Sequence, residues 1–102
     1  MTKYNAVKTT IDGITFHSIS ESERYMFLRM LQLSGGISDL RLQVPYEIIV
    51  NGQKICKYIA DFVYTKNGNV VVEDVKGFPT AVYKLKKKLM KAVHGIEIQE
   101  VK

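Results

Sequence analysis

Residues 58–77 read YIADFVYTKNGNVVVEDVKG, and this stretch predicts a β-hairpin that brings two aspartates together. Asn67-Gly68 is the strongest short hairpin signal in the chain, because Asn-Gly suits a two-residue turn and alternating apolar residues flank it. Such a turn places Asp61 directly opposite Asp74. Directly opposed residues have Cβ atoms roughly 4.5–5.5 Å apart, and like charges at that distance destabilise a sheet. The pair therefore requires a chemical explanation.

Alternation along the two strands predicts which side chains share a face. Lys76 lies on the face of the two aspartates, and Glu73 points to the other face. Ile59, Val63 and Val72 are expected beside the carboxylates, so the surroundings are mainly apolar. Two carboxylates in such surroundings either share a proton or are neutralised by a cation, and Mg²⁺ takes oxygen ligands of this kind.

A plainer interpretation is a solvated strand pair whose aspartates pair with lysines. Lys76, two residues after Asp74 and on the same face, favours phosphodiester hydrolysis instead. In that reaction a metal activates water and stabilises charge on the phosphate, while an ammonium group positions the nucleophile or supports the transition state. We therefore expect Mg²⁺ at the two carboxylates, with Mn²⁺ as a substitute.

The composition predicts one globular domain over residues 1–102, with 46% hydrophobic and 25% charged residues. The lone Cys56 cannot form an intrachain disulfide, which fits a reducing cytosol. The N-terminus MTKYNAVKTT is polar, and no apolar run approaches the roughly 20 residues that a membrane-spanning helix needs. We expect a cytoplasmic protein with no membrane partner.

The formal net charge is +5, and part of it is concentrated in YKLKKKLMK, residues 83–91. A basic surface attracts polyanions, so nucleic acid is the first partner to consider. Many small soluble proteins are basic as well, so this charge alone does not identify a partner.

The remaining pattern predicts a helix, a three-strand meander, a helix and a strand. A short strand pair over residues 7–16 precedes them and turns at Asp12-Gly13. The expected elements are a helix beginning at Ser18 or Ser20 and ended by Gly35-Gly36, strands at about 41–50, 54–65 and 69–76, a helix at about 80–93, and a strand at 96–101. This order predicts an α/β domain with a mixed sheet in αβββαβ order.

The two helices carry different patterns. In the first, the predicted core stripe is Phe27, Leu28 and Leu31, with further apolar surface at Met26, Met30 and Leu33. In the last helix, the predicted buried stripe is Val82, Leu85, Leu89 and Val93, with Lys84, Lys87, Lys88 and Lys91 on the opposite side. Such a lysine run is by default a solvated face, and beside a phosphate-cleaving site it becomes a candidate DNA contact. Lys86 borders the apolar stripe, where it either reaches the substrate phosphate or only extends to solvent.

The segments ADF, residues 60–62, and EDVKG, residues 73–77, resemble the PD-(D/E)XK nuclease superfamily. The wider layout is similar to a family of short phage and prophage proteins assigned to that superfamily. The segments that carry this similarity are HSISESERYMFLRML, LQVPYEI, YIADFVY, VVVEDVKGF and YKLKKKL, so it spans roughly residues 4–100. The resemblance implies a restriction-endonuclease-like core.

The resemblance also implies roles for individual residues. Asp61 and Asp74 would be metal ligands with the Val75 carbonyl as a third, and Lys76 would be the catalytic lysine. Glu21 matches the helix glutamate that completes the site in many members. The departure from the pattern is alanine, in place of proline, before Asp61.

Two of the implied site residues have alternatives. Glu21 fits the capping-box spacing from Ser18, so it is also a candidate cap residue. Gln43 matches a polar position near the site in the family, but simple alternation from the Asn51-Gly52 turn places it opposite Ala60, facing away from the aspartates. Only a bulge near Pro45 would bring Gln43 round to the site.

The function implied is a Mg²⁺-dependent DNA endonuclease. The domain is too small for a separate sequence-recognition module, which suggests a structure-selective enzyme for branched or Holliday-junction DNA. Related resolvases act as two-fold dimers, so a homodimer is expected here, with apolar surface around the first helix as its interface. The setting implied is phage recombination or replication in the cytoplasm of a bacterial host, beside other phage replication or recombination proteins.

Two alternatives to the endonuclease remain open. In the first, the chain is a catalytically inactive module with a nuclease-like fold that binds nucleic acid or protein. In the second, the acidic cluster binds a structural ion. The sequence does not distinguish DNA from RNA as the ligand.

Overall fold

The computed structural model describes residues 8–76 and 78–101, so residue 7 of the predicted strand pair and the two ends of the predicted domain lie outside it. The elements are β1 (Thr9–Ile11), β2 (Ile14–Phe16), α1 (Ile19–Leu33), β3 (Ser38–Val50), β4 (Gln53–Lys66), β5 (Asn69–Val75), α2 (Ala81–His94) and β6 (Gln99–Val101). The predicted order of helices and strands is confirmed, including the leading hairpin. Neither helix in the described part has the length and apolar composition that a membrane crossing requires.

Tight turns between successive strands set the sheet topology. Asp12-Gly13, Asn51-Gly52 and Asn67-Gly68 each have two consecutive positive φ angles, as two-residue hairpin turns of this kind need. The larger sheet has the order β3-β4-β5-β6, with β5 and β6 parallel and the other pairs antiparallel. The chain is therefore an α/β protein with a mixed four-stranded sheet, as predicted.

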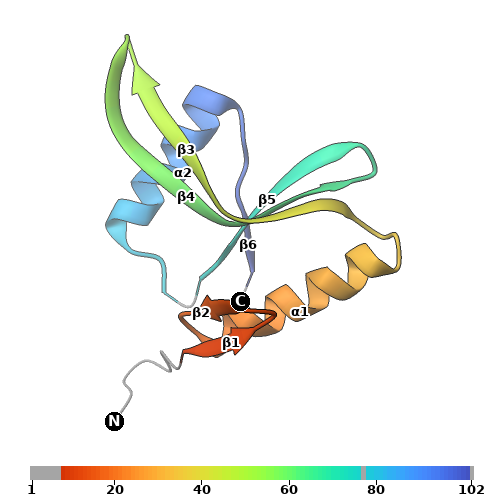
Figure 1. Cartoon of the computed structure of the whole chain (residues 1–102). Helices are drawn as coiled ribbons and strands as arrows, with labels where there is room; N and C mark the ends of the chain where they lie inside the picture. The colour runs from red at the N-terminus through yellow and green to blue at the C-terminus, as the bar shows by residue number, and fades with distance from the viewer. Residues whose placement is uncertain (1–7, 77, 102) are drawn as a thin grey trace.

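The two helices cover separate cores (Figure 1). Helix α1 lies with the β1–β2 hairpin below the sheet, and α2 lies behind the long arm formed by β3 and β4. The core under α1 contains Phe16, Tyr25, Leu28, Ile37, Phe62 and Tyr64. The core under α2 contains Ile48, Tyr58, Ala60, Val63, Val72, Tyr83, Met90 and Ile98.

The even-numbered residues of β3 and β4 pass from one core to the other in the middle of the strands. Leu42 and its partner Phe62 pack in the α1 core, whereas Val44 and its partner Ala60 pack in the α2 core. Gln43, between them, has φ of 52°, a left-handed value that is unusual for a non-glycine residue in a strand. Regular alternation is therefore interrupted at this point of the arm.

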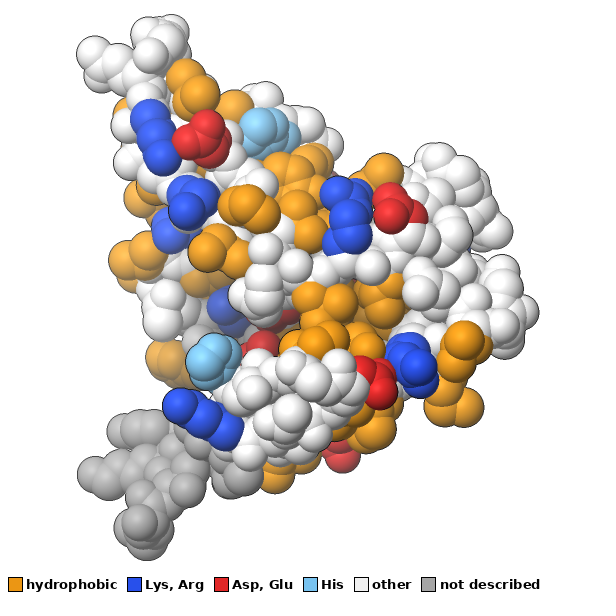
Figure 2. Space-filling model, viewed as in Figure 1, with side chains coloured by type: hydrophobic (Ala, Val, Ile, Leu, Met, Phe, Trp, Pro, Cys, Tyr) orange, Lys and Arg blue, Asp and Glu red, His pale blue; other side chains and the backbone are white. Residues whose placement is uncertain are grey.

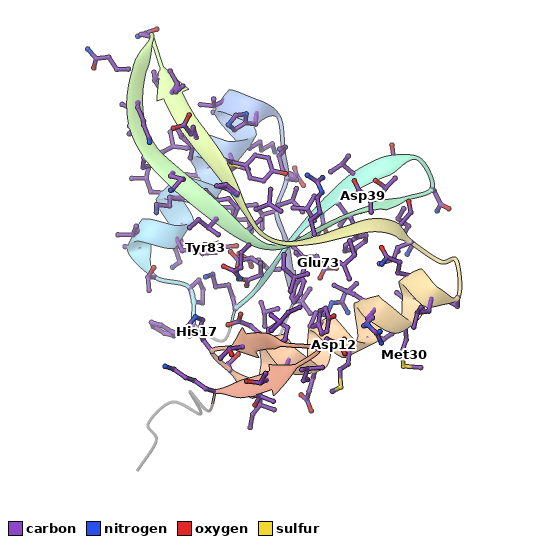
Figure 3. The ribbon with its side chains drawn as sticks, viewed as in Figure 1. Asp12, His17, Met30, Asp39, Glu73 and Tyr83 are labelled. Atoms are coloured by element: carbon purple, nitrogen blue, oxygen red, sulfur yellow. The ribbon has the colours of Figure 1, made fainter. Side chains whose placement is uncertain are left out.

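The predicted core stripe of α1 is partly wrong. Leu28 is buried and Leu31 half-buried, but Phe27 is 51% exposed, and Tyr25 is buried in its place. The outward face of the helix instead carries Ile19, Met26, Phe27, Met30 and Leu33, all exposed. Met30 points away from the body of the molecule (Figure 3). Because α1 is apolar on both sides, its pattern did not indicate which side faces the sheet.

The predicted buried stripe of α2 is also partly wrong, and of its four members only the half-buried Leu89 packs against the core. Val82 is 64% exposed, and Leu85 and Val93 are exposed as well, whereas Tyr83 and Met90 are buried. The helix is thus rotated by about one residue, or about 100°, from the predicted orientation. The half-buried Lys86 and Lys87 flank the true buried face, since lysine stems can cover apolar surface while the ammonium group stays in water.

Candidate active site

The β4–β5 hairpin has the predicted register. Val63 pairs with Val72 and Phe62 with Glu73, and in the same register Asp61 and Asp74 come next. Both side chains line the same pocket, and the negative charge of Asp74 raises the pKa of Asp61. The two aspartates therefore lie just past the last paired residues of β4 and β5, where Asp74 still pairs with Glu100 of β6.

Asp74 is the more buried member of this pair, with 2% of its surface exposed. The Tyr58 hydroxyl donates to Asp74 Oδ2 at 2.7 Å, and Lys76 Nζ lies 3.4 Å from Oδ1. Burial and the bond to Asp74 raise the pKa of Tyr58, so its hydroxyl stays protonated and acts as a donor. The Asp74 carboxyl group is thus held between a phenol and an ammonium group.

Asp61 has weaker compensation. The Val75 N–H donates to Asp61 Oδ2 at 2.8 Å, and Gln43 Nε2 lies 3.4 Å from Oδ1. Burial, followed by the close negative carboxylate of Asp74, raises the pKa of Asp61 to about 7, and the charge of Glu21 adds to the increase. No cation contacts Asp61 among the described residues. One negative charge of the pair therefore has to be neutralised by a proton or by a bound cation.

The predicted orientation of Gln43 is wrong. Ile49 pairs with Lys54 but Ile48 pairs with Cys56, so Ile55 is an extra residue on β4. This bulge shifts the β3–β4 register by one residue and places Gln43 opposite Asp61 instead of Ala60. The bulge that brings Gln43 to the site is thus on the partner strand, far from Pro45.

Ser18 is the N-cap of α1, and Glu21 lies at the capping-box position three residues later. Ser18 Oγ accepts from the Glu21 N–H at 3.1 Å, and the Glu21 carboxylate lies 3.5 Å from the same oxygen. The negative charge of Glu21 contributes to the raised pKa of Asp61. Among the described residues, however, three or more histidine, cysteine, aspartate or glutamate side chains do not gather at one point. The site has two close carboxylates and a third at longer range.

The paired aspartates line an open pocket of about 300 Å³. Its other lining residues are Lys57, Tyr58, Ile59, Lys76, Thr80, Val82, Tyr83 and Lys86. Figure 2 shows a recess between the upper and lower parts of the molecule, with acidic and basic side chains inside it. The apolar surroundings differ from the expectation, because Ile59 is 46% exposed at the rim while Val63 and Val72 are buried.

The five lysines of α2 divide between two cavities. Lys86 lines the acidic pocket, whereas Lys84, Lys87, Lys88 and Lys91 line a second cavity of about 610 Å³ beside Glu97 and Glu100. Lys87 pairs with Glu100 at 3.0 Å, and Lys91 pairs with Glu97 at 2.9 Å. The fold therefore brings one of the five predicted lysines to the carboxylates and places four on another flank of the helix.

Glu73 points to the opposite face, as predicted. Its carboxylate accepts from Arg24 Nε at 2.9 Å and Nη2 at 2.6 Å, and from the Tyr64 hydroxyl. Glu73 is labelled between the sheet and α1 in Figure 3. This buried ion pair joins α1 to β5 at the residue before Asp74, on the opposite face of the strand. It therefore helps to fix the position of β5 at the site.

Two tyrosines of the site were not predicted. Alternation placed Tyr58 on the far face of β4, and it reaches Asp74 because the strand changes cores at Asp61. Tyr83 lies under Lys76, with Nζ 4.4 Å from the ring centroid. One sequence signal could have identified Tyr83. It lies seven residues before Met90, which places the two side chains on the same face of the helix.

A protein-family model, described as a protein of unknown function (DUF1064), matches residues 1–101. The chain belongs to this family. No curated protein matches the sequence.

The donor set of the DUF1064 pocket fits a hard divalent cation. Each carboxylate oxygen of Asp61 and Asp74 has one described partner, and such an oxygen can accept a second interaction. Mg²⁺ is usually bound by one or two carboxylates, water and substrate phosphate, which two close aspartates beside an open pocket can accommodate. The uncompensated charge on Asp61 is what a cation would neutralise.

Proposed function

We propose that the chain is a Mg²⁺-dependent DNA endonuclease with a restriction-endonuclease-like core of the PD-(D/E)XK type. The observation that carries this proposal is the pair Asp61–Asp74 with Lys76 beside it, in a pocket open to solvent. Paired carboxylates with an adjacent ammonium group are what metal-assisted phosphodiester hydrolysis requires. A non-catalytic binding module has little use for two opposed carboxylates at this depth.

In this proposal Asp61 and Asp74 hold the ion, with the Val75 carbonyl as a further ligand and Glu21 as a distant acidic residue. A bound Mg²⁺ would supply Lewis-acid activation of water and neutralise charge on the phosphate, and Mn²⁺ would substitute for it. Tyr58 and the Val75 N–H keep the two carboxylates in place. Lys76 directs its ammonium group to the attacked phosphate and orients the nucleophile.

The substrate proposed is DNA. Lys57 and Lys86 line the pocket with the aspartates, so they are placed to contact the phosphates on either side of the cut. Lys84 and Lys88 line the second cavity and form no ion pair within the described residues. In this proposal they contact phosphates of the DNA backbone farther from the cut. We propose a structure-selective enzyme for branched or Holliday-junction DNA in phage recombination or replication, because the described fold has no further recognition element.

The proposal includes a homodimer formed through the outward face of α1. That face is apolar except for Glu23, and a two-fold axis would place it against its own copy. Homodimer interfaces are more apolar than other contact surfaces, and a nearly uncharged face offers no charge pattern for a different partner. Two active sites related by the axis would cut two strands symmetrically.

The test uses labelled linear, nicked, flapped and four-way-junction DNA with the purified protein. Each substrate is incubated with Mg²⁺, with Mn²⁺ and with a chelator, and the products are separated by size. Cutting that needs the metal and prefers one branched substrate is the expected result. Equal DNA binding by wild type and by Asp74→Asn, with no cutting of any substrate, would contradict the proposal and favour the inactive binding module. A rise in melting temperature with Mg²⁺ but no turnover would favour a structural ion.

A further inference from the structure

Lys76 is held on two sides. Its Nζ lies 3.4 Å from Asp74 Oδ1 and 4.4 Å from the centroid of the Tyr83 ring. Its backbone N–H donates to the Val101 carbonyl at 2.9 Å, which ties the start of the side chain to β6. The side chain remains 30% exposed, so the ammonium group still reaches the pocket.

Tyr83 is itself fixed in position. It is buried on α2, and its hydroxyl donates to Glu100 Oε2 at 2.8 Å. Lys87 Nζ contacts the same carboxylate oxygen at 3.0 Å. Tyr83 is labelled on the α2 side of the centre of the sheet in Figure 3. Because both ends of the ring are constrained, its face can act as a fixed surface for a neighbouring cation.

A lysine needs such a surface more than most residues do. Its four-carbon stem is flexible, and its ammonium group is a point charge without a preferred direction. The face of an aromatic ring attracts a cation within about 6 Å of the centroid. With Asp74 on one side and the ring on the other, the ammonium group loses freedom without losing access to the pocket.

We propose that Tyr83 is a positioning residue that holds the Lys76 ammonium group at the pocket through its ring face, and that Glu100 fixes the ring. The catalytic part of this inference rests on the proposed nuclease function; the placement of Lys76 does not. Tyr83 acts on Lys76 and contacts no reacting atom. A tyrosine present only to fill the α2 core would have no specific effect on Lys76.

The kinetic test compares Tyr83→Leu with Tyr83→Phe, since phenylalanine keeps the ring face and leucine removes it. We expect Tyr83→Leu to lower kcat about 10-fold with little change in KM, and Tyr83→Phe to restore most of the loss. In a Lys76→Ala background, Tyr83→Leu should change kcat less than about 2-fold, because the group it positions is gone. Equal losses in the leucine and phenylalanine variants, or a full further loss in the Lys76→Ala background, would overturn the proposal.

A second readout needs no activity. The Tyr83 ring should shift the NMR signals of the terminal methylene protons of Lys76 upfield from those of exposed lysines. The shift should be lost in Tyr83→Leu, and it should persist, reduced to a similar extent, in Tyr83→Phe and Glu100→Ala, because both remove the bond between the Tyr83 hydroxyl and Glu100. The matched control Glu97→Ala, on the Lys91 pair, should leave the shift unchanged. Wild-type Lys76 signals at the positions of exposed lysines would contradict the proposal even if Tyr83→Leu fails to fold. If no DNA is cut but the upfield shift is present, the nuclease proposal fails and the placement of Lys76 stands.

Discussion

Gln43 lies opposite Asp61 across the β3–β4 arm, with its Nε2 3.4 Å from Asp61 Oδ1. Gln43 also has a left-handed φ of 52° at the place where the arm passes from one core to the other. Strained backbone of this kind persists where surrounding structure enforces it, and it is common at functional sites. Gln43 thus combines the hydrogen bond to Asp61 with a strained backbone conformation.

The strain at Gln43 can be measured by comparing two truncations. Gln43→Gly and Gln43→Ala both remove the amide, but only glycine adopts the left-handed conformation freely. We expect the glycine variant to be more stable by about 0.5–1 kcal/mol in urea denaturation, after the entropy cost of glycine. Arg41 is exposed and its φ is not positive, so at that position alanine should be the more stable of the two. A more stable alanine variant at both positions would show that the backbone of Gln43 is unstrained.

The raised pKa of Asp61 predicts a pH dependence of stability. Between about pH 4 and the folded pKa of about 7, the folded state binds more protons than the unfolded state, so the free energy of unfolding falls as pH rises. In the presence of a chelator, Asp61→Asn should reduce the difference in unfolding free energy between pH 5 and pH 8 by about 1–2 kcal/mol. Urea denaturation at the two pH values measures it. A difference unchanged in Asp61→Asn would show that this carboxyl group has an ordinary pKa.

The ion pair between Arg24 and Glu73 should be important for stability. Glu73 is 2% exposed, so Arg24→Ala would leave a buried carboxylate without its cation, at a cost of about 3–5 kcal/mol. Arg29→Ala is the matched control from the same helix, because its pair with Asp12 is exposed and should contribute less than about 1 kcal/mol. Thermal and urea unfolding measure both variants. Similar losses for the two arginines would contradict this difference.

The outward face of α1 predicts a dimer that a single charge disrupts. Met30 is 70% exposed, and Met30→Glu should convert a dimer to a monomer without lowering the unfolding free energy of the chain by more than about 0.5 kcal/mol. Light scattering after size-exclusion chromatography measures the mass. Val70→Glu is the control, since Val70 is exposed on β5 and not on α1. A wild-type monomer at all concentrations, or equal dissociation by Val70→Glu, would exclude this interface.

The β4–β5 hairpin could be predicted because its signals are local. Asn67-Gly68 supplies two positive φ angles, and the turn determines the register as far as Phe62 and Glu73. The proximity of Asp61 and Asp74 follows from that register alone. For the same reason, the orientation of Glu73 to the face opposite the aspartates was predicted correctly, whereas its burial was not predicted.

The rest of the site depends on tertiary packing that no short pattern contains. The bulge at Ile55 shifts β3 against β4, yet isoleucine is an ordinary strand residue and signals no bulge. The orientation of α2 is decided by Tyr83 and Met90 in the core, although Val82 and Leu85 form an equally regular apolar stripe. As a result, Gln43, Tyr58 and Tyr83 reach the pocket from positions that alternation and periodicity assign elsewhere.

The proposed roles of Asp74 and Lys76 in DNA cleavage are tested most directly by the single-turnover cleavage rate with Mg²⁺ on the preferred substrate. Wild type is compared with Asp74→Asn, Lys76→Ala and the control Lys66→Ala, whose lysine is exposed at the turn of the same hairpin. We expect the cleavage rate to fall about 100-fold or more in the first two variants and less than about 2-fold in the control. Cleavage at the wild-type rate by Asp74→Asn or Lys76→Ala would contradict these roles.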